Sequence, residues 1–250
     1  MRRAGWVCGV AVALAALAVQ PATAQEPEGL IGQVYVIEAQ AGAEQQWEDA
    51  YKRHVEWHRA QNDSWGWPVW QIITGERAGR YVIGTFGHEW TDLDRGDFGS
   101  RDRADARTNQ NRYAAATSVE IWRRRPELSR PPEGEMPAMA IAYYNTLHQG
   151  MLGPYSAAVR KINEAITAAD WGVGYYRNVI VNSGDDPRVV RWLSRPSWAD
   201  FESPEPSFPA MLADAYGQEE TTAILETLAR TVRDSRSEIW AYRADLSYVP

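Results

Sequence analysis

The most constraining feature of this sequence is a segment that occurs twice. "SVEIWRRRPELS" begins at Ser118, "SRSEIWAYRADLS" begins at Ser235, and both contain Glu-Ile-Trp. At a shift of 108 residues further positions match in the same order: Tyr35 with Tyr143, Gly42 with Gly150, Arg80 with Arg188, and Trp90 with Trp198. Ordered matches over two stretches of about a hundred residues indicate an internal duplication.

Each copy changes its residue pattern in the same order. "GQVYVIEAQ" and "AIAYYNTLH" are rich in β-branched and aromatic residues and predict strands. "AEQQWEDAYKRHVEWHRAQ" and "GPYSAAVRKINEAITAA" follow as predicted helices, and then come two strands, a second helix and the Glu-Ile-Trp strand. The second helix is clear in "QEETTAILETLARTVRDS" and weak in "RDRADARTNQNRYAAA", and we interpret "GDFGSRDRAD" as a solvated loop. The order is that of the ferredoxin-like unit, so we predict an α+β fold with two tandem ferredoxin-like βαββαβ repeats.

The two repeats should pack sheet against sheet within one chain. We place the first repeat at residues 25–125, a linker rich in proline and charge at 126–137, and the second repeat at 138–250. Strands of the second repeat are apolar at nearly every position, so both of their faces should be covered. This arrangement resembles the dimeric α/β-barrel superfamily in its element order and duplication. The resemblance implies a monomer with an internal pseudo-dimer. The superfamily includes small monooxygenases, lactone isomerases, and haem-binding dismutases and peroxidases.

The first 24 residues have the pattern of an export signal. Arg2 and Arg3 precede an apolar run, and Ala22-Thr23-Ala24 forms a cleavage pattern. The run is shorter than the roughly 18 residues that cross a bilayer, so we expect no membrane insertion after cleavage. We expect a periplasmic or secreted protein, without cysteine once Cys8 is removed.

The charge of the chain is acidic. Its formal net charge is −7, and removal of the two leader arginines would make it about −9. This charge argues against nucleic acid as a partner.

Two histidines on the first helix are candidate catalytic residues. His54 and His58 are four residues apart and share a helix face with Trp47 and Tyr51. The second repeat has isoleucine at the aligned positions. We expect no metal ion or other cofactor. The favoured interpretation is structural hydrogen bonding, and the alternatives are proton transfer, a metal bound by the pair, or haem bound by either histidine.

The Glu-Ile-Trp strands supply further candidates. Glu120 and Trp122 share one strand face, as do Glu238 and Trp240, and we expect this face to point into the barrel. Either glutamate could act as a base if burial raises its pKa. The favoured alternative is an internal network that pairs Glu38, Glu120 and Glu238 with Arg177 and Arg191.

Aromatic and strand-end residues complete the candidate ligand site. Trp67 lies in a tryptophan-rich strand entry, and His88 ends the third strand of the first repeat. The predicted ligand-binding residues are Trp122, Trp240, Arg177, Arg191, His88 and Trp67. For most of the tryptophans, and for His88, packing or a solvated turn is the alternative interpretation.

The function predicted from these patterns is binding of a small apolar or aromatic molecule in a barrel cavity. The alternative is an enzyme of the dimeric α/β-barrel type, either a cofactor-free monooxygenase or isomerase or a haem-binding enzyme. A structural module without a ligand remains a third interpretation.

Overall fold

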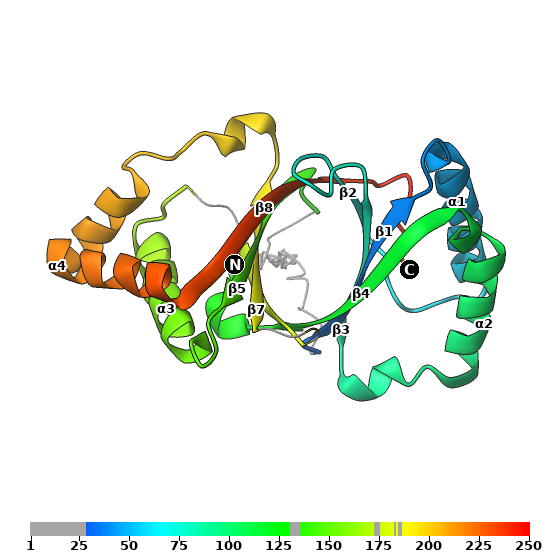
Figure 1. The fold of residues 1–250 in the computed structure, drawn as a ribbon, viewed down its shortest axis with the longest axis horizontal. Coiled ribbons are helices and arrows are strands. Elements are labelled where there is room, and N and C mark those ends of the chain that lie inside the picture. Colours follow the sequence, from blue (N-terminus) through cyan, green and yellow to red (C-terminus); the bar gives the residue numbers. More distant parts are fainter. Residues whose placement is uncertain (1–28, 131–135, 173–175, 183, 185–186) are drawn as a thin grey trace, which may run out of the picture.

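The chain folds around a closed barrel of eight antiparallel strands (Figure 1). The computed structural model describes residues 29–130, 136–172, 176–182, 184 and 187–250, with only the backbone of 176–178. The predicted export signal and part of the predicted linker lie outside this range. No helix in the described part is long and apolar enough to cross a membrane.

The first half of the chain, residues 31–124, has the order β-α-β-β-α-β. Its elements are β1 (Ile31–Ala39), α1 (Glu44–Ala60), β2 (Val69–Ile72), β3 (Tyr81–His88), α2 (Gly96–Thr108) and β4 (Ala114–Arg124). The second half, residues 139–242, has the same order: β5 (Met139–Leu147), α3 (Leu152–Ala168), β6 (Tyr176–Val181), β7 (Arg188–Arg195), α4 (Phe208–Thr231) and β8 (Val232–Tyr242).

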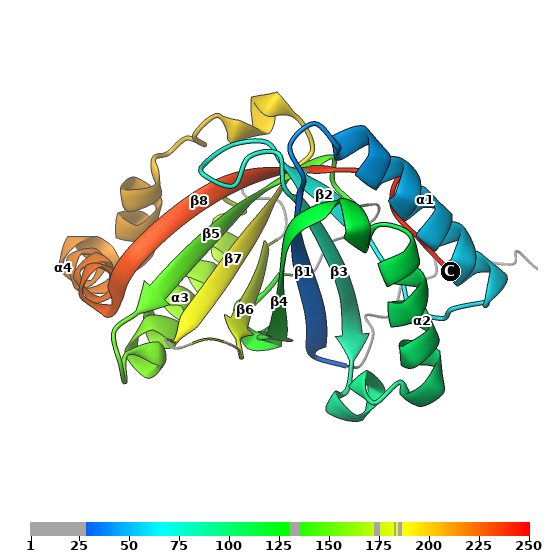
Figure 2. The ribbon, with the colours of Figure 1, turned by 45° about the vertical axis from the view of Figure 1, so that its right-hand side comes forward.

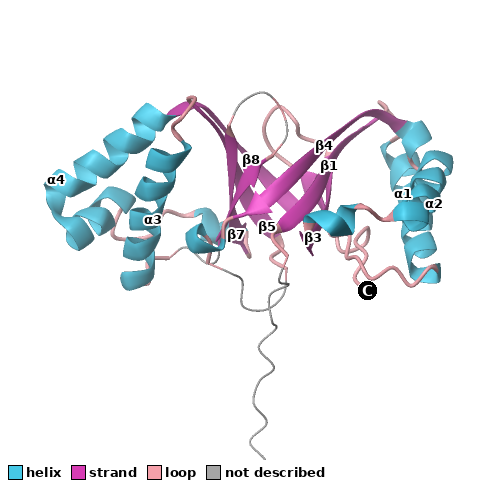
Figure 3. Cartoon of the chain, turned by 90° about the horizontal axis from the view of Figure 1, so that it is seen from below, coloured by secondary structure: helices cyan, strands magenta, loops and turns pink. Residues whose placement is uncertain are grey.

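The strand order around the barrel is β1-β3-β2-β8-β5-β7-β6-β4. Each half therefore contributes four adjacent strands, and the halves meet at the pairs β2·β8 and β4·β6. Within the described residues, each of these pairs matches three residues on either strand. Helices α1 and α2 lie outside one side of the barrel, and α3 and α4 lie outside the opposite side (Figures 2 and 3).

Tryptophans from both halves fill the inside of the barrel. Trp70 lies 6.0 Å from Trp240 and 6.1 Å from Trp192 between ring centroids, and Trp122 lies 6.3 Å from Trp240. All four indoles are buried. Trp122 and Trp240 point into the barrel, as the alternation along their strands predicts.

The glutamates of the Glu-Ile-Trp strands form ion pairs between the halves. Glu238 on β8 accepts two hydrogen bonds from Arg77, both of 2.7 Å. Glu120 on β4 accepts one of 2.8 Å from Arg188 on β7. Each glutamate also accepts from the indole Nε1 of the tryptophan two residues later. These ion pairs therefore tie one half to the other inside the barrel.

The predicted membership of this network is wrong in part. Glu38 pairs with Arg80 at the surface, where their side chains are 43% and 36% exposed. Arg191 donates to Asn163 on α3, so it faces the helices. The side chain of Arg177 lies outside the described residues. Glu120 instead pairs with Arg188, the first residue of β7, and Glu238 pairs with Arg77 in the β2–β3 turn. A strand pattern does not distinguish arginines at such positions from exposed surface arginines.

Helix α2 corrects a second expectation. It begins at Gly96, so the segment interpreted as a solvated loop is helical. Gly99 is its only buried residue, and the helix has no apolar stripe. Asp102 and Asp105 of this helix contact His54 of α1. A search for apolar residues at helical spacing does not detect a helix that packs through carboxylates.

Loss of the buried ion pair should destabilise the fold. The Glu238 side chain is 2% exposed, and Glu238→Gln leaves the Arg77 guanidinium without its carboxylate partner. We therefore expect a loss of about 3 to 5 kcal/mol in unfolding free energy. Glu38→Gln, at the exposed pair with Arg80, should cost less than about 1 kcal/mol. Urea denaturation measures both, and equal losses would contradict the assignment.

Candidate functional site

The barrel interior holds little free space. A cavity of about 80 Å³ lies near one end, lined by Trp70, Phe86, Trp122, Trp192 and Trp240. This is smaller than a cavity of about 150 Å³ that accepts benzene. The tryptophans thus act mainly as packing, and a larger aromatic ligand needs another site.

Helix α1 places both candidate histidines on its buried face. Trp47, Tyr51, His54 and His58 follow one another at spacings of four, three and four, and all are buried. Trp47 stacks on Tyr81 of β3 at 4.1 Å between centroids. This aromatic packing fixes the helix on the sheet and points the imidazoles toward α2.

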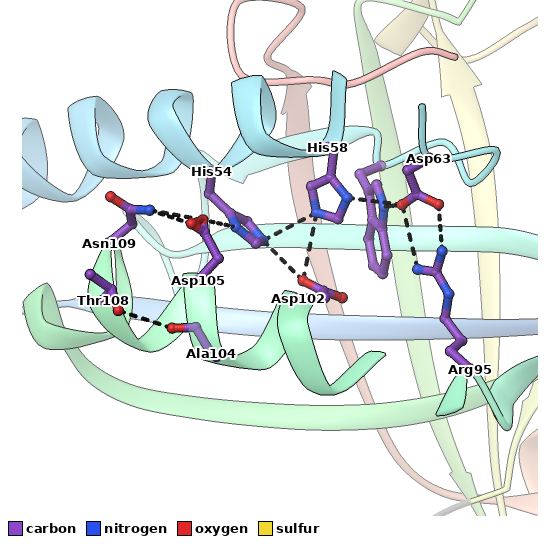
Figure 4. Close-up of polar contacts among 10 residues, drawn as sticks. His54, His58, Asp63, Arg95, Asp102, Ala104, Asp105, Thr108 and Asn109 are labelled. Atoms are coloured by element: carbon purple, nitrogen blue, oxygen red, sulfur yellow. Dashed lines mark hydrogen bonds and ion pairs between the residues drawn. The ribbon is translucent and has the colours of Figure 1, made fainter. Parts of the chain in front are cut away.

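The imidazoles of His54 and His58 meet at their Nε2 atoms, which lie 3.1 Å apart (Figure 4). The two residues are 5% and 3% exposed. Asp102 on α2 places Oδ1 3.3 Å from Nε2 of His54 and 3.7 Å from Nε2 of His58. Three potential ligand atoms therefore converge on one point between the helices.

Two further carboxylates hold the opposite nitrogens. Nδ1 of His54 lies 3.0 Å from Oδ1 of Asp105, and Nδ1 of His58 lies 2.8 Å from Oδ2 of Asp63. Asn109 donates from Nδ2 to both oxygens of Asp105 at 2.8 Å. Each imidazole is thus oriented by a carboxylate, an arrangement that also orients metal-bound histidines.

Asp63 is the most strongly held of these groups. It accepts from Arg95 and from Nε1 of Trp67 at 3.0 Å, in addition to its contact with His58. Burial raises the pKa of Asp63, but the hydrogen bonds from His58, Arg95 and Trp67 outweigh burial and hold the pKa far below its usual range. Arg95 also stacks on Trp65 at 3.9 Å. Asp63 is therefore an ionised carboxylate in a nearly closed environment.

Two phenols lie in the field of Asp102. Burial, with the charge of Asp102 as the next cause, raises the pKa of both Tyr35 and Tyr51. Both phenols therefore stay neutral at physiological pH and can serve as hydrogen-bond donors beside the histidine cluster.

The sequence patterns did not find Asp63, Arg95, Asp102 and Asp105. Asp102, Asp105 and Asn109 follow spacings of three and four, which place them on one helix face. That polar spacing was the available signal. It was missed because the helix was only weakly predicted there, and residues 96–105 were interpreted as a solvated loop.

The second half contains an open groove between its sheet and its helices. Its volume is about 600 Å³, in the usual range for small-molecule sites of about 300 to 1,000 Å³. We call it the helix-face groove; its lining includes Tyr143, Asn145, Tyr155, Trp171, Arg191, Arg195, Phe201, Glu202 and Phe208. We expected both faces of these strands to be covered, but Tyr143 is 36% exposed, so the face toward the helices is covered only in part.

Two arginines of β7 lie in the helix-face groove. Arg191 donates to Oδ1 of Asn163 at 3.3 Å. Arg195 makes no ion pair within the described part of the chain, and its buried Nε has no hydrogen-bond partner there. Burial lowers the pKa of Arg195. An anionic group entering the groove would therefore meet an incompletely satisfied guanidinium.

The other predicted ligand-binding residues lie elsewhere. His88 is buried, and its Nε2 lies 2.6 Å from Oγ1 of Thr85. Its ring stacks on Trp65 at 3.8 Å between ring centroids. Trp67 packs behind His58 at 5.4 Å between ring centroids. Both belong to the surroundings of the histidine cluster and line neither cavity. Of the predicted ligand residues, Trp122 and Trp240 line the barrel cavity and Arg191 lines the groove.

Comparison with known proteins identifies the fold. No protein-family model matches the chain, and no curated protein matches it. A proposed monooxygenase from Lactobacillus acidophilus NCFM has a TM-score of 0.56 at 10% identity, with 89% of this chain and 97% of that chain covered. An anthrone oxidase-like protein also has a TM-score of 0.56, at 8% identity and with coverages of 88% and 93%. A chlorite dismutase variant from Candidatus Nitrospira defluvii has a TM-score of 0.54 at 9% identity, with coverages of 86% and 92%.

These neighbours belong to the dimeric α/β-barrel superfamily. This chain has a dimeric α/β-barrel fold. Outside that barrel the two helix layers differ, since the first encloses the histidine cluster and the second borders the groove. The barrel therefore offers two chemically distinct places for function.

The stability contributed by Asp63 should depend on pH. The folded pKa of Asp63 lies below the unfolded value of about 3.9, so its ionised form stabilises the fold at pH values above about 4. This stabilisation is lost as the pH falls toward the folded pKa. The difference in unfolding free energy between the parent chain and Asp63→Asn should therefore shrink between pH 6 and pH 3. A constant difference in denaturant titrations would contradict this.

Proposed function

We propose that the chain binds a small aromatic acid in the helix-face groove. The observation that carries the proposal is the position of Arg195 in an open space of about 600 Å³ walled by aromatic side chains. Tyr143, Trp171 and Phe208 offer flat apolar contacts. A ligand with one aromatic body and one carboxylate matches both features.

The balance of charge in the groove favours an anion. Arg191 and Arg195 are its lining cations, while Glu202 is its lining carboxylate. Nη1 of Arg195 donates a hydrogen bond of 2.9 Å to the backbone oxygen of Ser194, and this bond holds the side chain in place. A carboxylate could accept from the remaining donors of this guanidinium, and such charge-assisted bonds are stronger than neutral ones.

The corresponding space in the first half is filled. Trp47, Tyr51 and Val55 of α1 pack there with Tyr81 and Ile83 of β3. The C-terminal segment closes the same cluster with buried Leu246 and Tyr248. The comparison supports a ligand site in the second half, at a different place from the predicted barrel cavity.

Haem, which the family resemblance implies, does not fit at the histidine pair of the first half. Nε2 of His54 and Nε2 of His58 face each other at 3.1 Å, so a porphyrin cannot approach either nitrogen. The described lining of the groove contains neither histidine nor cysteine. The proposal therefore does not include haem.

Oxygenation of the bound aromatic acid is a second candidate function. It is favoured by the fold shared with a proposed monooxygenase and an anthrone oxidase-like protein. Oxygen consumption with a tight-binding groove ligand would test it.

Two wider proposals accompany this one. The identical element order of the halves and the reciprocal glutamate pairs support an origin by tandem duplication of a ferredoxin-like unit. The sequence pattern of residues 1–24 supports export.

Calorimetric titration with 2-naphthoate and its neutral isostere 2-naphthamide tests the ligand class. Because the carboxylate can pair with Arg195, naphthoate should bind roughly 10-fold or more tightly than the amide. Arg195→Gln should abolish this preference.

The control is Arg80→Gln, which removes an exposed arginine of the first half. This variant should keep the preference for naphthoate. Equal binding of the two compounds by the parent chain, or an unchanged preference in Arg195→Gln, would refute the proposal.

A further inference from the structure

We propose that His54, His58 and Asp102 form a binding site for one divalent transition-metal ion between α1 and α2. The site lies in the first half and does not depend on the proposed ligand of the second half. It would use Nε2 of each histidine and one oxygen of Asp102 (Figure 4).

The hydrogen bonds of the histidines leave both Nε2 atoms facing one point. Nδ1 of His54 lies against Asp105 and Nδ1 of His58 lies against Asp63, and an ionised carboxylate only accepts hydrogen bonds. Each Nδ1 therefore carries the hydrogen, and in a neutral imidazole the lone pair is then on Nε2. Two lone pairs 3.1 Å apart repel each other unless a proton on one nitrogen or a metal cation lies between them. The oxygen of Asp102 at the same point adds a third pair of electrons.

The distances between the three ligand atoms fit one small ion. Ligands about 2.1 Å from a common ion are roughly 3.0 Å apart at a right angle and roughly 3.4 Å apart at the tetrahedral angle. The observed separations are 3.1, 3.3 and 3.7 Å. These values suit three corners of a tetrahedron, with the fourth left for water or a small ligand.

The donor set indicates the class of metal. Two imidazoles and one carboxylate suit zinc, iron, nickel or copper, whereas calcium and magnesium prefer oxygen ligands alone. The carboxylates on both Nδ1 atoms give each histidine the outer partner that metal-bound imidazoles usually have. Asp102 is 19% exposed, so an ion can reach the site from the side of α2.

The second half provides an internal comparison. The positions aligned with His54 and His58 are Ile162 and Ile166, which are buried against the sheet and α4. The same helix position can therefore be filled by an aliphatic side chain in this fold. The histidine pair and the carboxylate-bearing α2 occur together in the first half only, as an ion site requires.

Zinc titration of the chelator-stripped full chain tests the proposal. The parent chain should bind one zinc ion, and zinc should raise its melting temperature because the ion binds the folded state. Asp102→Asn removes the carboxylate ligand but keeps nearly the same side-chain shape, at a position that is partly exposed. It should weaken zinc binding by about 100-fold and reduce the rise in melting temperature at a given zinc concentration.

Two further variants control for charge and for folding. Asp97→Asn removes a carboxylate from the same helix, at a side chain that is 90% exposed, and should bind zinc like the parent chain. The double exchange of His54→Ile and His58→Ile installs the residues of the second half and should bind no zinc at this site. Failure of the parent chain to bind zinc, or equal zinc affinity in Asp102→Asn and Asp97→Asn, would overturn the proposal.

Discussion

The closure of the barrel between its halves is the constraint on which the rest of the structure depends. Each seam is short, with three matched residues on either strand of β2·β8 and of β4·β6. Burial of the four central tryptophans adds cohesion between the halves, since apolar burial contributes about 25 cal/mol per Å². The ion pairs of Glu120 and Glu238 then fix the register, because a shift of one residue would turn these groups out of the barrel. A core filled in this way leaves the outer helix layers as the places where the halves can differ.

The two helix layers differ in how they meet the sheet. In the first half, aromatic packing by Trp47 and Tyr81 holds α1 on the sheet, and α2 then meets α1 through charges around His54 and His58. In the second half, α3 packs against α4 through aliphatic residues such as Ile162, and the space above Tyr143 stays open. We therefore propose a metal-ion site between α1 and α2 of the first half, where polar groups converge in a closed helix layer. We propose a ligand site in the second half, where the space between the sheet and the helices is open.

The sequence predicted the fold better than the site. Periodicity and the matched order of the copies predicted the α+β fold and the inward direction of Trp122 and Trp240, because both depend on local alternation. The histidine pair was also visible, as a departure from Ile162 and Ile166. Its carboxylate partners were not, since Asp102 reaches His54 and His58 through packing of a polar helix without an apolar stripe, and Asp63 lies in the loop after α1. The partners of the buried glutamates were missed for a related reason: Arg77 lies in a turn, and only closure of the barrel brings it to Glu238.

An anomalous difference map from zinc-soaked crystals is the measurement that tests the central claim most directly. The claim is that the first half alone assembles a metal centre from α1 and α2. The account predicts one strong peak at the zinc edge, about 2.1 Å from Nε2 of His54, Nε2 of His58 and an oxygen of Asp102, with none at the aligned isoleucines. A map without a peak between these three side chains, at saturating zinc, would contradict it.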